Sequence, residues 1–288
     1  NRKALWDAVG SRIFDAHLDR FKDCAVEVLA ELDPQFDLPA NERYAASIHG
    51  KVLKHSPGLR KGMAETLALL GNHGVILTNC SQHKAESTAV LSLREIFEHA
   101  DWKLWCSLND LLPTLAEAAP AEFLHAVEDA LRQTPCPFDE LFAQEGTGIS
   151  GRNYMTGLLW ALEGLAWSED HLVRVAVILA ELASHDPGGN WANRPANSLT
   201  TILLPWYPQT LAPVDKRITS IKAIRTDFPD VAWEVLLTLL PNQHQTSSGA
   251  HKPRWRNILP EDWKPNVTTK EYWTQVIGYA ELAVEMAS

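Results

Sequence analysis

The feature that most constrains the fold of this chain is a phrase that occurs three times. Each copy has an apolar run of helical character, a short break at Pro or Trp, and a second run that opens with acidic residues. The copies cover residues 111–124, 158–172 and 202–215. Their breaks, at Pro120, Trp167 and Pro213, lie 47 and 46 residues apart. A constant spacing of this size is typical of chains built from repeated helix pairs.

The spacing fits the HEAT and armadillo repeats, whose helix pairs recur every ~40–47 residues. We therefore expect an all-α fold, a HEAT/TPR-like helical-repeat solenoid made of stacked antiparallel helix pairs. Stacked pairs present an extended surface, and such surfaces generally bind other macromolecules. The pattern predicts a non-catalytic protein-recognition or sensor module.

The sequence divides into three parts. Residues 1–106 predict an irregular N-terminal helical region, which includes a helix over 42–52, and residues 107–241 contain the HEAT-like repeats. Residues 242–288 begin with a loop that is too polar to bury and that we expect to be mobile. Because the chain opens at Asn1 with neither an initiator Met nor a leader, it is expected to be a piece of a longer polypeptide.

The end of the chain predicts a capping helix. Thr268 and Glu271 have the spacing of a capping box, which marks a helix N-terminus. Its apolar residues are expected to pack against the repeats, and they are Val276, Ile277, Ala280, Leu282, Ala283 and Val284.

Charge and composition limit the classes of partner that this chain is expected to bind. The 288 residues carry 26 Lys and Arg against 36 Asp and Glu, a net charge of −10. An acidic chain is a poor general binder of nucleic acids and anionic membranes, so a basic protein surface is the easier partner. No apolar stretch approaches the ~20 residues needed to cross a bilayer. The four cysteines are scattered without a C-x-x-C pair, which predicts reduced thiols, no metal site and a cytoplasmic location.

Residues 146–151 match the G-x-G-x-x-G pattern of dinucleotide-binding turns. That chemistry needs a strand before the turn, so that the pyrophosphate lies on a helix N-terminus. Here the preceding residues 138–145 are helix-like and acidic, which repels phosphate. We interpret the motif as an interhelical loop and expect no cofactor.

Two alternatives to a recognition module stay open. An enzyme would need a site built from loops, around His185 and Asp186 together with residues 251–256. No H-E-x-x-H pair and no G-x-S-x-G nucleophile motif supports that hypothesis. An RNA-binding helical array is the other alternative, because residues 251–256 place cations around an aromatic ring.

Aromatic and basic residues mark the candidate binding surface. Of 11 Trp residues, Trp160, Trp167, Trp206 and Trp233 fall in or near the repeats and are expected to wedge between helices. Exposed Trp and Arg side chains in loops are typical hot spots of protein interfaces. The candidate partner-binding residues lie in two loops and are Trp191, Asn193, Arg194, Lys252, Arg254, Trp255 and Arg256.

Several phrases resemble a known group of proteins. They cover residues 107–113, 159–163, 193–195, 204–206 and 252–256. Together, across about residues 42–256, they are similar to the helical-repeat regions of large bacterial STAND-type NTPases, some of which act in antiviral defence. The resemblance implies a TPR- or HEAT-like sensor that binds a foreign protein, in a chain that also carries an effector and a nucleotide-binding switch. The G-x-x-x-x-G-K-[ST] phosphate-binding loop of NTPases does not occur in the sequence.

Overall fold

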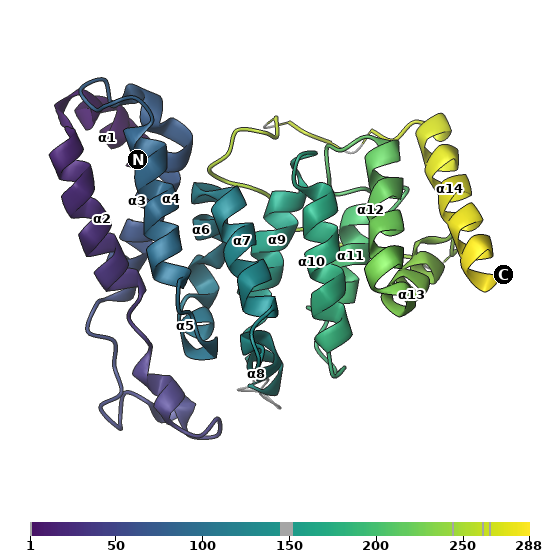
Figure 1. The fold of residues 1–288 in the computed structure, drawn as a ribbon, viewed down its shortest axis with the longest axis horizontal. Helices are drawn as coiled ribbons and strands as arrows, with labels where there is room; N and C mark the ends of the chain where they lie inside the picture. The colour runs from purple at the N-terminus through teal and green to yellow at the C-terminus, as the bar shows by residue number, and fades with distance from the viewer. Residues whose placement is uncertain (1, 145–151, 244, 261, 265) are drawn as a thin grey trace. The chain divides into compact units, whose positions relative to one another are not determined.

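The computed structural model describes residues 2–144, 152–243, 245–260, 262–264 and 266–288. Throughout these ranges the regular secondary structure is helical and contains no β-strand (Figure 1). The predicted all-α class is therefore confirmed. Contacts divide the chain into two compact units, unit 1 over Asn1–Gly157 and unit 2 over Leu158–Ser288. The division at 106/107 and 241/242 stays a prediction.

Unit 1 contains the helices α1 to α8, joined by turns and short 3₁₀ segments. The bounds are α1 Arg2–Val9, α2 Asp15–Leu29, α3 Pro57–His73, α4 Lys84–Phe97, α5 Trp102–Ser107, α6 Leu112–Ala118, α7 Pro120–Leu131 and α8 Pro137–Ala143. The 3₁₀ segments are Gly10–Arg12, Pro34–Asp37, Arg43–Ala45, Gly74–Ile76 and Asn109–Leu111.

The prediction of a helix over residues 42–52 is wrong. Only Arg43–Ala45 form a single 3₁₀ turn there, and Gly50 has a left-handed φ of 68°. Tyr44 and Ile48 are 82% and 85% exposed, so the segment has no buried apolar face. Short helices draw most of their stability from packing such a face, and this segment has none to pack.

Helix α3 lies at the centre of unit 1, in contact with α2, α4 and α6. Its apolar face, which includes Leu67 and Leu70, is fully buried. The approach of α3 to α6 depends on Gly71, because a Cβ at this position would lie 1.9 Å from the carbonyl oxygen of Ala118. An aromatic cluster fills the space between the later helices of the unit, and it consists of Phe97, Trp105, Phe123 and Phe138.

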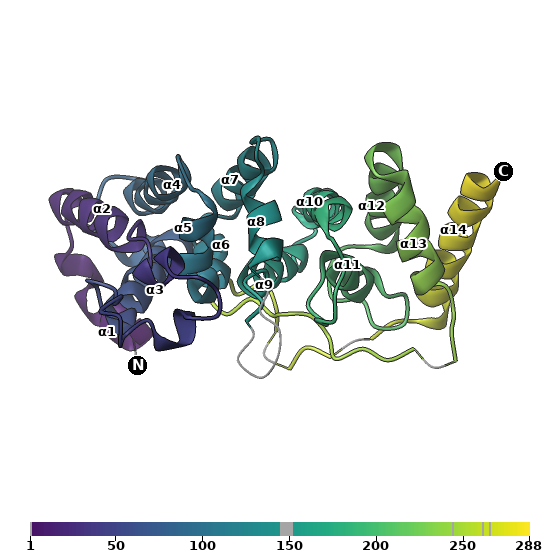
Figure 2. The ribbon, with the colours of Figure 1, turned by 90° about the horizontal axis from the view of Figure 1, so that it is seen from below.

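Unit 2 is a two-layered arrangement of helices. The bounds are α9 Thr156–Ala166, which begins just before the unit boundary, α10 Leu172–His185, α11 Pro195–Leu203, α12 Val214–Asp227, α13 Pro229–Leu239 and α14 Thr269–Ala287. Helices α10 and α12 lie side by side in one layer, with α9 and α11 in the other (Figure 2). The recurring phrases match successive helices: α6 and α7 in unit 1, then α9 with α10 and α11 with α12 in unit 2.

Helix α14 is attached to unit 2 by a buried polar network. The Gln275 side chain donates to the carbonyl oxygen of Leu203, at 2.8 Å, and to the Tyr279 hydroxyl, also at 2.8 Å. Arg217 of α12 donates to the Gln275 side-chain oxygen at 3.0 Å. Gln275 and Tyr279 are both fully buried, and the capping box of Thr268 and Glu271 is present as predicted.

Nowhere in the described ranges is a helix long and apolar enough to cross a membrane.

We expect Gly71→Ala to destabilise the protein by about 3 kcal/mol, because the added methyl group collides with the backbone of α6. Gly58 on the same helix is the matched control, since a Cβ there meets only the Ser56 hydroxyl oxygen at 4.0 Å. Gly58→Ala should change the free energy of unfolding by less than about 1 kcal/mol. Urea denaturation of both variants measures the difference, and equal stabilities would contradict the close approach of α3 and α6.

Candidate functional site

A long return segment, residues 245–260, runs back along unit 2 and is held by a half-buried carboxylate. Glu163 of α9 accepts the backbone N–H of His251 at 2.8 Å through one oxygen. Its other oxygen accepts the hydroxyl of Ser198, on α11, at 2.7 Å. Burial raises the pKa of Glu163, while the two hydrogen bonds act in the opposite direction. One side chain thus joins two helices to the return segment.

Aromatic rings also contact the return segment. The His251 ring stacks on Trp160, with centroids 5.5 Å apart and planes 12° apart. The indole N–H of Trp167 donates to the His251 carbonyl oxygen at 2.8 Å, and Trp263 meets the Trp167 ring edge-on at 4.7 Å. The Lys252 ammonium lies 4.8 Å from the centre of the Trp263 ring. This part of the loop expected to be mobile is anchored to the core of unit 2.

The first loop of candidate binding residues is closed by an ion pair. The Arg194 guanidinium donates to the Asp186 carboxylate at 2.8 Å, and the backbone N–H of Gly188 donates to the same oxygen at 2.8 Å. Arg194 is only 6% exposed. It therefore holds the ends of the loop together, while Trp191 and Asn193 between them are half-buried.

The second group of candidate binding residues lies on the return segment. Lys252 and Arg254 are exposed, whereas Trp255 and Arg256 are half-buried. Burial and the charge of Arg254 lower the pKa of His251, so this imidazole is neutral at pH 7. A role for these four residues in binding a partner stays a prediction.

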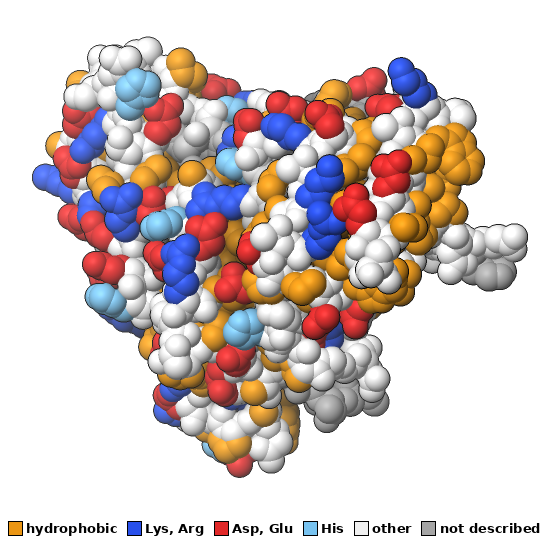
Figure 3. All heavy atoms as spheres, turned by 45° about the vertical axis from the view of Figure 1, so that its right-hand side comes forward, with side chains coloured by type: hydrophobic (Ala, Val, Ile, Leu, Met, Phe, Trp, Pro, Cys, Tyr) orange, Lys and Arg blue, Asp and Glu red, His pale blue; other side chains and the backbone are white. Residues whose placement is uncertain are grey.

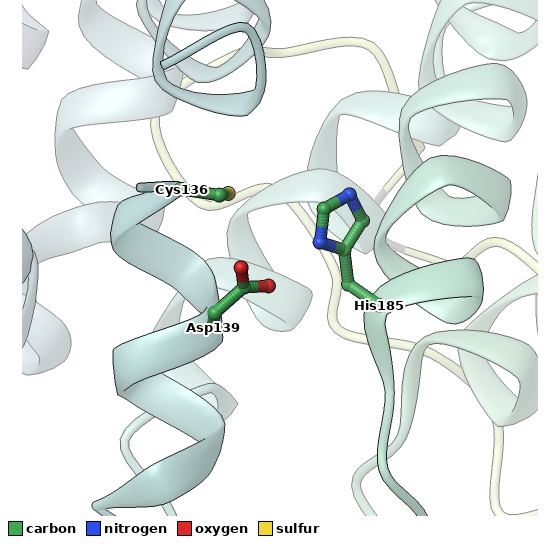
Figure 4. Close-up of side chains that lie close together, drawn as sticks. All are labelled: Cys136, Asp139 and His185. Carbon is green, nitrogen blue, oxygen red and sulfur yellow. The ribbon is translucent and has the colours of Figure 1, made fainter. Parts of the chain in front are cut away.

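The residues of the alternative enzyme site have structural contacts of their own. Asp186 is paired with Arg194, and the His251 ring lies on Trp160. Figure 4 shows Cys136 and Asp139 at the start of α8 and His185 as the last residue of α10. In the described part of each unit taken alone, no three His, Cys, Asp or Glu side chains come close enough to share a metal ion. The G-x-G-x-x-G motif at 146–151 falls outside the described residues.

The most accessible apolar surface of unit 2 belongs to α14. Trp273, Ile277 and Val284 are 52%, 53% and 67% exposed, and Ala280 between them is half-buried. Their spacing of four, three and four residues places them on one stripe, which we call the α14 seam. Figure 3, which brings this side of the molecule forward, shows apolar side chains gathered there. The opposite side of α14 is buried through Gln275, Val276, Tyr279, Leu282 and Ala283.

The exposed fractions of apolar side chains in unit 2 correct two expectations. Ile277 and Val284 do not pack against the repeats as Val276 and Leu282 do. The sequence did not indicate this, because a helix with apolar residues on both sides is ordinarily read as buried on both. Trp160 and Trp206 are also 43% and 40% exposed and so are not interior wedges, whereas Trp167 is fully buried.

Comparisons of the chain with protein-family models, with curated proteins and with solved structures find no match.

We expect Glu163→Ala to release the return segment, because the mutant loses both hydrogen bonds made by the carboxylate. Hydrogen bonds to charged groups contribute about 1.5–3 kcal/mol, so amide hydrogen exchange around His251 should speed up by at least about tenfold. Glu169→Ala is the control, since Glu169 is exposed and lies 3.8 Å from Lys216 in a surface ion pair. Unchanged exchange in Glu163→Ala would contradict the anchoring role.

Proposed function

We propose that this chain is a non-catalytic, HEAT/TPR-like recognition module that binds an amphipathic helix of a protein partner along the α14 seam. The observation that supports the proposal is the exposure of Trp273, Ile277 and Val284 on one stripe of a helix whose other side is buried. Soluble monomers seldom leave such contiguous apolar surface uncovered, so it marks an interaction site.

The spacing of the seam suggests the shape of the partner. Steps of four and three residues are those of the a and d positions in a coiled coil, where a second helix inserts its side chains between them. Trp273 is the largest of these residues, and Trp is enriched among the side chains that dominate interface energies. A partner helix with apolar residues at the same spacing would bury the stripe.

Charge suggests the polarity of the partner. Glu281 is exposed beside the seam at the position that flanks a coiled-coil interface. The whole chain carries a net charge of −10. A partner helix with Lys or Arg at its flanking positions is therefore attracted, and an acidic helix is repelled.

The wider context belongs to the same proposal. The breaks of the recurring phrase lie 47 and 46 residues apart and fall between or beside paired helices, which supports a HEAT-like repeat. From the resemblance to STAND-type NTPases, we further propose that the module is the sensor of a larger, cytoplasmic bacterial defence protein. The loop residues Trp191 and Asn193, with Lys252, Arg254, Trp255 and Arg256, are further candidate contacts. Arg194 is not included among these contacts, because it is buried and has a structural role in its own loop.

The test uses two synthetic amphipathic helices with Leu at a and d, one with Lys and one with Glu at the flanking positions. We expect the Lys peptide to bind the full chain at least about tenfold more tightly, as measured by fluorescence anisotropy. Ile277→Glu should weaken that binding at least about tenfold, because it places a carboxylate in the middle of the seam. Leu237→Glu on α13 is the matched control, since Leu237 is 51% exposed and lies off the seam.

Three results would overturn this proposal. The first is equal binding of the Lys and Glu peptides, and the second is equal loss of binding in Ile277→Glu and Leu237→Glu. The third is self-association in sedimentation that Ile277→Glu abolishes, because the seam would then be covered by a second copy of this chain.

A further inference from the structure

Unit 1 contains a pocket of about 350 Å³ beside the 3₁₀ segment Arg43–Ala45. Its described lining includes Arg43 and Arg152, two tyrosines and the side-chain amides of Gln35 and Asn41. No Asp or Glu is found among the described residues that line it. A pocket with two guanidinium groups stands out in a chain with ten more acidic than basic side chains. The volume is that of a site for a small organic molecule.

Arg43 is held in place and keeps donor capacity. Its Nε donates to the carbonyl oxygen of Leu38 at 3.1 Å. Its guanidinium carbon lies 5.2 Å from the centre of the Phe36 ring and 5.9 Å from that of Trp102. Its Nη1 is buried and has no hydrogen-bond partner within the described part of the chain. Leaving a buried charged donor unpaired is costly, and an oxyanion in the pocket would relieve that cost.

The tyrosines give the pocket a neutral donor and a flat wall. Tyr154 is 7% exposed and packs edge-on against Phe36, with centroids 5.3 Å apart. Burial raises the pKa of Tyr154, against the opposing charges of Arg43 and Arg152, so its phenol keeps its proton at pH 7. Tyr44 is 82% exposed and presents an accessible ring to the pocket. Arg152 is exposed and can reach an anion without burying its charge.

We propose that this pocket binds a small aromatic molecule carrying a phosphate or carboxylate group, with the oxyanion between Arg43 and Arg152. Guanidinium groups match the planar, two-oxygen geometry of these anions and bind them with two parallel hydrogen bonds. The aromatic part of the ligand lies against Tyr44. The site is independent of the α14 seam, because all of the described lining residues belong to unit 1.

The proposal is tested on the full chain by isothermal titration calorimetry with four probes: phenyl phosphate, benzoate, inorganic phosphate and neutral benzyl alcohol. We expect saturable, salt-sensitive binding of phenyl phosphate and benzoate, weaker binding of inorganic phosphate, and none of benzyl alcohol. Arg152→Gln should weaken phenyl phosphate binding at least about tenfold, because one of the two cations is lost. Arg20→Gln, which removes the same charge from an exposed position on α2, should leave it unchanged.

A second variant tests the geometry. Arg43→Lys keeps the positive charge but loses the planar fork, so we expect it also to weaken phenyl phosphate binding at least about tenfold. Its circular dichroism shows whether it folds, and if it does not, Arg152→Gln decides. The proposal is overturned if no probe binds below about 10 mM. Binding of benzyl alcohol as tight as that of phenyl phosphate, or equal binding by Arg152→Gln and Arg20→Gln, also overturns it.

Discussion

The carbonyl groups at the ends of helices are the constraint on which both units depend. The last four carbonyls of a helix have no partner within it, and burying one unpaired costs about 1–3 kcal/mol. In unit 1 a single side chain meets this demand at two helix ends and also pairs with the carbonyl of Glu31, two residues beyond α2. Arg60, 2% exposed, donates to the carbonyl oxygens of Val28 at 3.1 Å, Glu31 at 2.9 Å and Ser107 at 3.1 Å. It thereby fixes the ends of α2 and α5 against α3.

The same solution is found at the end of α11. In unit 2 the last carbonyl of α11, that of Leu203, accepts from both Gln275 and Tyr279, which fixes one side of α14 against the unit. Because that side of α14 is packed against the unit, the stripe through Trp273 and Ile277 on the opposite side has to face outward. The candidate recognition surface is thus a consequence of how a buried polar network is satisfied.

Local patterns predicted the helices but not the sites. The recurring phrase correctly indicated helical runs, and Thr268 with Glu271 correctly marked the start of α14. The prediction of a helix over residues 42–52 failed, because helical periodicity without an apolar face to bury does not make a helix. The pocket could not be found from sequence, since Arg43 and Arg152 are 109 positions apart and neither belongs to a motif. The anchoring of His251 likewise needs Glu163, which is 88 positions away.

By itself, the sequence determined the all-α class, the helical runs of the recurring phrase, the start of α14 and the acidic charge, because these depend on neighbouring residues and on sums over the chain. Only the tertiary structure decided which apolar side of α14 is buried, that Arg194 serves its own loop, and that a polar return segment lies fixed on unit 2. The physical reason is that burial and hydrogen-bond pairing are properties of contacts between distant residues, and a periodic pattern does not say which contact is made.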